Sequence, residues 1–211
     1  MESPSIPLDR RFRGYLPVII DIETAGFNPK KNALLEIGAV IVEFNADGDL
    51  EITERYSAHV IPFKNSELDE AALKFNGIEP YHPFRMAIDE DEALHMIFRP
   101  IRHAIKRNLC TRAILVGHNP AFDLNFLNAA IQRTQNKRNP FHPFSTFDTA
   151  TLGGLVYQET VLAKAAKAAG LAWDNEKAHS ALYDAEMTAT LFCKIVNRWK
   201  QLESLTDKPD M

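Results

Sequence analysis

The stretch at 18–26, VIIDIETAG, constrains the fold most strongly, because an apolar run typical of a buried strand carries two acids. Side chains on a strand alternate between its faces, so Asp21 and Glu23 share one face while Ile20 and Ile22 share the other. Two carboxylates this close repel each other unless one is protonated or a cation lies between them. Hard divalent cations take oxygen ligands, so the stretch predicts a metal ion beside this strand.

The order of the expected elements indicates an α/β fold. Strand-like runs at 17–23, 34–44 and 53–62 are joined by short connections, which favours an antiparallel meander, and a fourth run follows at 112–118. Strands first, then strand and helices in alternation, predict a mixed β-sheet flanked by α-helices. Helical patterns are expected at 89–107, where Pro100 should kink or interrupt the helix, at 121–133, at 161–170 with Gly170 as the cap, and from about 180 to 202.

The length of 211 residues suits one well-buried domain and is short for two. We expect a single domain over 1–211, with an N-terminal arm at about 1–14 and a flexible tail at about 203–211. No apolar run approaches the roughly 18 residues of a membrane helix, and the first residues lack the apolar core of a secretion signal, so a cytoplasmic location is expected. Both cysteines, Cys110 and Cys193, are expected to be reduced.

Charge is segregated along a chain whose formal net charge is −4. Basic residues gather at 10–13, 102–112 and 133–138, whereas acids concentrate at 43–54 and 67–92. Segregation of this kind can give a phosphate-binding face on an acidic protein. Taken alone, each basic cluster is read more simply as a solvated helix face.

Three further polar residues lie where a sheet of this class holds its ligands. Asp123 follows the strand at 112–118 and falls in the first turn of the next helix, where it can join a ligand site or only complement the helix dipole. His179 and Asp184 are five residues apart and would not share a face of one continuous helix. Ser180 is a good N-cap, which would place His179 just outside the last helix and Asp184 one turn inside it.

The ordered set Asp21-x-Glu23, Asp123 and His179-x4-Asp184 resembles the DEDDh class of 3'→5' exonucleases, whose fold is ribonuclease H-like. The segments IDIETAGFN, FNGI at 75–78, GHNPAFD and AHSALYDAEMTATLF resemble the ribonuclease T family of bacteria. The resemblance implies that the four carboxylates hold two Mg²⁺ ions, for which Mn²⁺ can substitute. It further implies that His179 is the general base, and imidazole suits proton transfer near neutral pH.

The same resemblance implies the substrate. The expected activity is trimming of the 3' ends of structured RNAs, in transfer RNA end turnover and in the maturation of transfer RNA and other stable RNA precursors, with release of nucleoside 5'-monophosphates. Single-stranded DNA is a further expected substrate. The implied stacking residues for the terminal bases are Phe27, Phe75, Phe122 and Phe144, whereas Phe126 and Phe147 are expected to be core residues.

The resemblance also implies a homodimer in which a basic patch of one subunit serves the active site of the other. One departure from the family concerns base preference. The family has a glutamate four residues before the FNG phenylalanine, and this chain has Ala71 there, with Glu70 adjacent. The implied patch residues are Arg11, Arg13, Lys106, Arg112 and Lys137.

Three other readings remain open. A haloacid-dehalogenase-like phosphatase also ends its first strand in two acids, but it needs a second aspartate at the position of Glu23. A polymerase proofreading subunit or an oligoribonuclease would share the fold and differ in preferring DNA or short RNA. A non-catalytic nucleic-acid-binding module is a non-enzymatic alternative, although decayed sites usually lose ligands and this chain retains the whole set.

Overall fold

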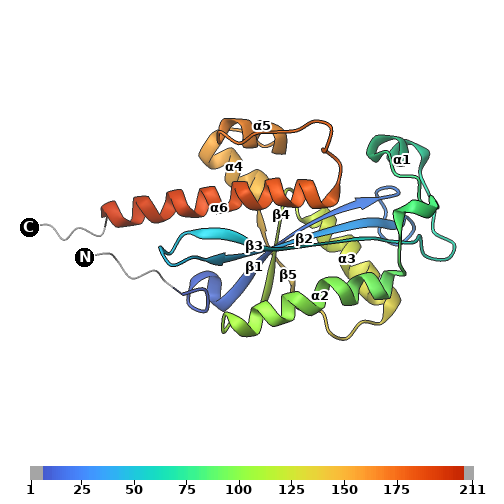
Figure 1. The fold of residues 1–211 in the computed structure, drawn as a ribbon, viewed down its shortest axis with the longest axis horizontal. Coiled ribbons are helices and arrows are strands. Elements are labelled where there is room, and N and C mark those ends of the chain that lie inside the picture. The colour runs from blue at the N-terminus through green and yellow to red at the C-terminus, as the bar shows by residue number, and fades with distance from the viewer. Residues whose placement is uncertain (1–6, 207–211) are drawn as a thin grey trace, which may run out of the picture.

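The computed structural model describes residues 7–206, with side chains described through residue 202. Its five strands form one sheet in the order β3-β2-β1-β4-β5 (Figure 1). β2 is antiparallel to both β1 and β3, whereas β4 pairs in parallel with β1 and β5. The predicted meander and mixed sheet are confirmed, and β5 is a strand that the sequence did not predict. The strands are β1 (Tyr15–Thr24), β2 (Leu34–Phe44), β3 (Leu50–His59), β4 (Arg112–Gly117) and β5 (Phe141–Asp148).

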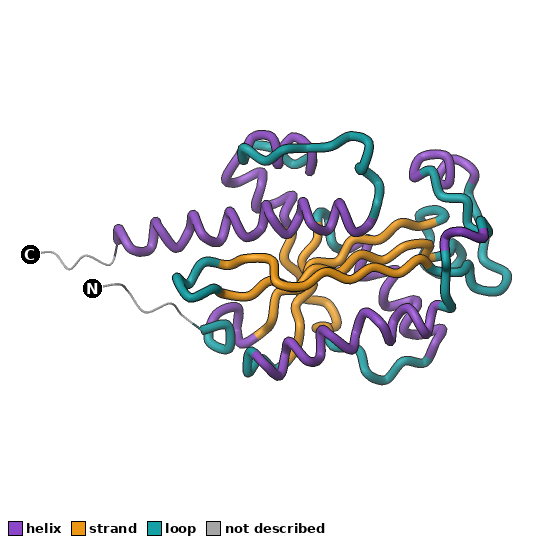
Figure 2. Tube along the Cα trace, viewed as in Figure 1, coloured by secondary structure: helices purple, strands orange, loops and turns teal. Residues whose placement is uncertain are grey.

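Helices cover both faces of this sheet (Figures 1 and 2). The long helix α6 lies along β1, β2 and β3 on one face, and α4 packs between α5 and α6 on that side. On the other face α2 and α3 pack against β1 and each other. The helices are η1 (Arg11–Gly14), α1 (Glu70–Asn76), η2 (Pro83–Arg85), α2 (Glu90–Arg107), α3 (Ala121–Thr134), α4 (Thr149–Tyr157), α5 (Leu162–Ala168) and α6 (Ala181–Thr206).

The alternation along β1 divides its side chains between two cores. Ile20 and Ile22 belong to the core with α2 and α3, whereas Ile19 belongs to the core with α6. Because the side-chain period of a strand is two, Asp21 and Glu23 project to the α6 face. The predicted sidedness of β1 is therefore confirmed, and it directs both acids toward the helix that carries Asp184.

Two predicted helix features have different outcomes. α2 runs through Pro100 as one helix of 18 residues, so the expected interruption is absent. Its apolar stripe is buried against the sheet, and this packing outweighs the one backbone hydrogen bond that proline cannot donate. α5 ends as predicted, because Gly170 has a φ of +73° and the Gly170 and Leu171 amides donate to the carbonyls of Lys167 and Ala166.

The chain termini are only partly described. Leu8 is buried in the core with α2, and Phe12 packs against both cores, so residues 7–14 of the expected arm lie against the body of the protein. α6 extends through the first part of the expected tail, and residues 1–6 and 207–211 lie outside the described range. Cys110 and Cys193 are both free thiols, as expected. Among the described helices, none is long and apolar enough to cross a membrane.

Candidate active site

The carboxyl end of β1 brings Asp123 of α3 to the two acids of the strand. The parallel pairing of β1 with β4 ends at Ile19, so the Ile22 amide lies beyond that ladder. This amide donates to Asp123 Oδ1 at 3.2 Å. Asp123 is only 5 % exposed, which makes the hydrogen bond a fixed link between the start of α3 and the acidic end of β1.

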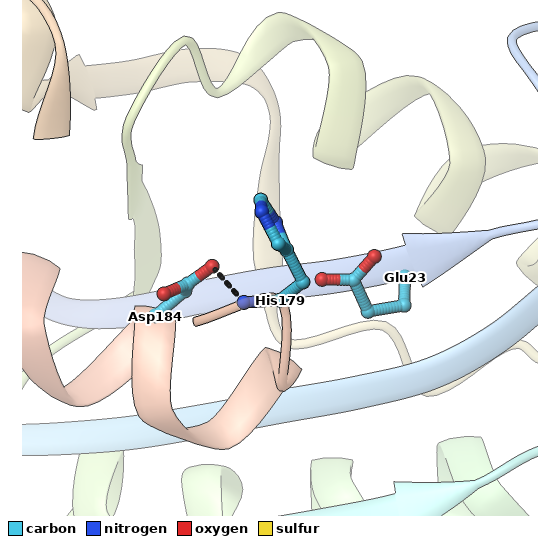
Figure 3. A group of neighbouring side chains, drawn as sticks. All are labelled: Glu23, His179 and Asp184. Atoms are coloured by element: carbon cyan, nitrogen blue, oxygen red, sulfur yellow. Dashed lines mark hydrogen bonds between the residues drawn. The ribbon is translucent and has the colours of Figure 1, made fainter. Parts of the chain in front are cut away.

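The start of α6 brings His179 and Asp184 to the same place. α6 begins at Ala181, and the Asp184 amide donates to the Ser180 carbonyl at 3.0 Å, so Asp184 lies in the first turn and His179 precedes the helix as predicted. His179 has a left-handed φ of +68°, and its amide donates to Asp184 Oδ2 at 3.2 Å (Figure 3). One ligand atom each from Glu23, His179 and Asp184 lies within 4.8 Å of the others.

Strand β2 fixes where α6 begins. Gly38 lies opposite Asp21 in the sheet, and a Cβ atom there would lie 2.4 Å from the carbonyl oxygen of Ala181. Only glycine allows so close an approach of helix to strand. Beside it, buried Glu36 lies opposite Glu23 and accepts a hydrogen bond from the Ser180 hydroxyl at 3.4 Å. The sequence did not single out Glu36.

Burial and mutual repulsion raise the pKa values of these acids. Burial is the largest cause for Asp21, whose pKa lies well above its usual range, and the charges of Asp123 and Asp184 add to it. Burial, and then the charges of Asp184 and Glu36, raise the pKa of Glu23 to about 8. Burial also raises the pKa of Asp123 to about 8, although two backbone hydrogen bonds to its carboxylate act to lower it. Without a cation, the site therefore favours protonated acids near neutral pH.

The donor set of this site fits a divalent cation. Asp184 Oδ1 is buried and accepts no hydrogen bond, although a buried carboxylate oxygen normally has a partner. The carboxylate oxygens around it are the ligands that Mg²⁺ and Mn²⁺ prefer, and one imidazole nitrogen lies beside them. A cation would supply both the missing partner of Asp184 and the charge that opposes the repulsion among the acids.

A cavity of about 380 Å³ opens beside Glu23 and is lined by three of the four expected stacking residues, Phe27, Phe75 and Phe122. Phe27 is 83 % exposed and Phe75 70 %, so both rings are accessible to a ligand that enters this cavity. Ala71 also lines this cavity, so the departure from the family falls on its wall. The fourth residue, Phe144, lies on β5 outside the lining and is 77 % exposed.

The remaining aromatic expectations concern packing. Phe126 is fully buried in the core with α2 and α3, as predicted. Phe147 is partly buried and packs against the core under α6, with its ring stacked on Phe192 at a centroid distance of 5.8 Å. The Phe75 ring lies 4.3 Å from the His179 ring between centroids, so the cavity and the acidic site share a wall.

The five expected basic residues lie at the opposite end of β1 and β4 from the acids. Arg112 begins β4 beside Tyr15, and the Thr111 amide donates to the Gly14 carbonyl, which holds η1 next to the start of β4. At roughly 3.3 Å per strand residue, β1 from Tyr15 to Glu23 spans about 26 Å. Arg11 and Arg13 lie in η1, Lys106 in the last turn of α2, Arg112 at the start of β4, and Lys137 between α3 and β5.

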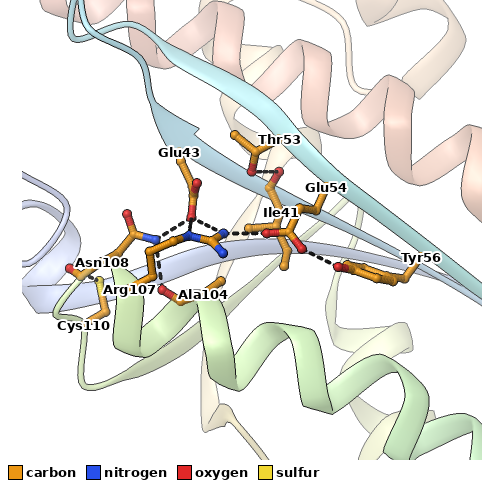
Figure 4. Close-up of polar contacts among 9 residues, drawn as sticks. All are labelled: Ile41, Glu43, Thr53, Glu54, Tyr56, Ala104, Arg107, Asn108 and Cys110. Carbon is orange, nitrogen blue, oxygen red and sulfur yellow. Dashed lines mark hydrogen bonds and ion pairs between the residues drawn. The ribbon is translucent and has the colours of Figure 1, made fainter.

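A polar network anchors the end of α2 that carries Lys106 (Figure 4). Arg107 donates to Glu43 on β2 at 2.7 Å and to Glu54 on β3 at 2.5 Å, and Asn108 also donates to Glu43. Glu54 in turn accepts from the Tyr56 hydroxyl. The network fixes this helix end on the hairpin of β2 and β3, and with it the position of Lys106.

The fold and the ordered acids define a DEDDh-type exonuclease with a ribonuclease H-like sheet. Two solved structures share this fold: Escherichia coli exonuclease I in complex with a dT13 oligonucleotide (TM-score 0.67, 16 % identity, 90 % of this chain and 43 % of that one), and the nuclease domain of 3'hExo, a DEDDh family member, bound to rAMP (TM-score 0.65, 19 % identity, 86 % and 92 %). The family model described as Exonuclease matches residues 18–192.

Similarity to curated proteins identifies one family within this class of exonucleases. The chain is 56 % identical over 208 residues to the ribonuclease T of Hahella chejuensis, which covers 98 % of this chain and 95 % of that protein. It belongs to the ribonuclease T family of exonucleases.

Proposed function

We propose that this protein, a 3'→5' exoribonuclease by family, trims the 3' ends of structured RNAs, including transfer RNA and the precursors of stable RNAs, and releases nucleoside 5'-monophosphates. The observation that carries the proposal is the convergence of Glu23, His179 and Asp184 within 4.8 Å at the carboxyl end of β1. Asp21 and Asp123 lie within electrostatic reach of the same point. A cluster of one buried and three half-buried acids beside one exposed imidazole suits metal-assisted hydrolysis of a phosphodiester.

Each polar residue has a distinct part in this reaction. Asp21, Glu23, Asp123 and Asp184 would hold two Mg²⁺ ions, or Mn²⁺ in their place. When bound, the ions lower the pKa of the attacking water and offset the charge that develops on the phosphate. His179 accepts the proton of that water on its ring. Its backbone bond to Asp184 places it at the site and leaves the exposed ring to face the substrate.

The aromatic cavity is proposed to hold the terminal bases. Phe27, Phe75 and Phe122 offer ring faces on which any base can stack. We propose that the exposed ring of Phe144 stacks on a base of the substrate outside this cavity. Stacking does not require a ribose hydroxyl, so single-stranded DNA is a second proposed substrate. The fold neighbour that binds a dT13 oligonucleotide supports this assignment.

We also propose a homodimer in which the basic patch of one subunit serves the acids of the other. The support is the separation within one chain, where β1 alone places the start of the patch about 26 Å from Glu23. A second subunit can bring its own patch closer to these acids, where it would bind the phosphates of a stem set back from the cleaved 3' end. The cytoplasmic location expected from the sequence stays a prediction.

A transfer RNA labelled at its terminal 3' phosphodiester tests the proposed reaction. With Mg²⁺, the label should leave as a nucleoside 5'-monophosphate, and RNA labelled at its 5' end should shorten from the 3' side only. Internal cuts, or equal activity in excess EDTA, would contradict the proposal. The same assay with matched DNA separates an RNA-trimming enzyme from a proofreading exonuclease, which would prefer the DNA.

A further inference from the structure

The short helix α1 ends at Asn76, whose side chain makes contacts on three sides. Its Nδ2 group donates to the Thr24 carbonyl at 3.1 Å. The same side chain lies beside the Glu23 carboxyl in the wall of the cavity, where it acts to lower the pKa of that acid. Its Oδ1 atom accepts from the Ile78 amide at 3.1 Å. A partly buried amide at the end of α1, a helix with no buried residue, therefore connects this helix to the acidic end of β1.

The chemistry of these three contacts requires a primary amide. Its NH₂ group has two donors, and its carbonyl oxygen is the acceptor for the Ile78 amide. The opposite orientation of the amide would place Oδ1 against the oxygens of Thr24 and Glu23, so the contacts fix which atom faces which. An aspartate would bring a third oxygen to the same place, and a serine could supply only one donor.

The position of these contacts is where the sheet stops fixing β1. The register of β1 with β2 shifts between Glu23 and Thr24, so regular pairing no longer orients the chain at this point. The Asn76 amide bonds the Thr24 carbonyl on one side of the shift and lies beside the Glu23 side chain on the other. It thereby sets the direction of a side chain that the ladder alone leaves less constrained.

We propose that Asn76 is a positioning residue for the metal site, whose amide holds the Glu23 carboxylate turned toward His179 and Asp184. The inference rests on the proposed function, because it assumes that Glu23 is a metal ligand. Groups that hydrogen-bond a metal ligand typically contribute 10–100-fold to metal affinity. Asn76 follows the stacking residue Phe75 in α1 and lines the same cavity as Phe75 and Glu23, so one helix end serves both the metal side and the base side of the site.

Calorimetric titration of the full-length, metal-free protein with Mn²⁺ tests this role without relying on activity. Asn76→Ala should weaken Mn²⁺ binding about tenfold or more. Asn197→Ala is the matched control: this partly buried asparagine also uses both ends of its amide, bonding the backbone of Leu50, but it contacts no acid of the site. Leu73→Ala controls for damage to the helix, because Leu73 packs α1 against the core of Ala25, Ala33 and Leu35 and does not line the cavity. Both controls should bind Mn²⁺ as the wild type does.

Asn76→Ser is measured in parallel, since it is a milder change that also removes the two-donor amide, and it too should bind more weakly. Wild-type Mn²⁺ affinity in either folded Asn76 variant would overturn the positioning role. Loss of affinity in Leu73→Ala equal to that in Asn76→Ala would also overturn it, because the effect would then belong to α1 as a whole. If the wild type bound no Mn²⁺, or Glu23→Gln bound it unchanged, the proposed function itself would fail.

Discussion

Glu23 combines partial burial with acidic neighbours, and these raise its pKa from 4.5 to about 8. An acid with a higher pKa in the folded chain binds more protons folded than unfolded, so stability falls as the pH rises between these two values. The free energy of unfolding in EDTA, measured with urea from pH 5 to pH 8.5, should therefore decline toward high pH. Glu23→Gln should flatten this decline, and Mg²⁺ should oppose it. Parallel profiles for the wild type and Glu23→Gln would contradict the raised pKa.

His179 makes its fixed contact with Asp184 through the backbone, which a substitution leaves in place. Because its φ is +68°, asparagine suits the position better than alanine, so His179→Asn separates loss of the imidazole from backbone strain. We expect single-turnover hydrolysis to slow by at least about 10², with Mn²⁺ affinity and RNA binding retained. A His179→Asn enzyme with wild-type turnover would exclude the general-base role.

Among the structural elements, α6 and β2 are in contact at Gly38, where a Cβ would lie 2.4 Å from the Ala181 carbonyl oxygen. Gly38→Ala should displace the start of α6, lower the free energy of unfolding by about 1–3 kcal/mol, and reduce activity further by moving Asp184. Gly154→Ala is the control, because its Cβ would meet only the Thr160 side chain, at 3.2 Å. Urea unfolding and turnover of both variants give the comparison. Full activity in Gly38→Ala would show that the site tolerates a shifted helix.

The elements also show what the sequence could predict. Alternation placed Asp21 and Glu23 on one face of β1, and the N-cap at Ser180 separated His179 from α6. β5 was missed because Phe141 is its only buried residue and the strand contains a proline. No alternation of apolar and polar residues therefore marks it in the sequence. α1 was missed because it buries no residue and has no apolar stripe.

Two residues of the site were beyond sequence reasoning for a different reason. Glu36 lies in an apolar strand, and only the register of β1 with β2 places it opposite Glu23. The connection over residues 25–33 is not a tight hairpin turn, so it does not fix that register from the sequence. Asn76 contacts Glu23 across more than fifty residues of chain, and no spacing rule marks such a contact.

At the scale of the whole molecule, the four acids of the site and the five residues of the basic patch lie at opposite ends of β1 and β4. If one subunit's basic patch serves the other subunit's acids, an Asp21→Asn chain and a chain with Arg13→Ala and Arg112→Ala should complement each other. Each protein alone should be inactive on transfer RNA, and mixing the two under subunit exchange should restore its cleavage. A short oligonucleotide should be cleaved by the arginine variant without mixing. Failure of restoration despite demonstrated exchange would favour a patch that serves its own chain.

The central claim is that the acids at the carboxyl end of β1 hold divalent ions for phosphodiester hydrolysis. The most direct measurement is anomalous diffraction from crystals grown with Mn²⁺ and a non-hydrolysable RNA 3' end. We predict two anomalous peaks bounded by Asp21, Glu23, Asp123 and Asp184, roughly 3.5–4 Å apart, with the terminal phosphate beside them. Mn²⁺ bound elsewhere, or a terminal phosphate ordered away from these four residues, would contradict the claim.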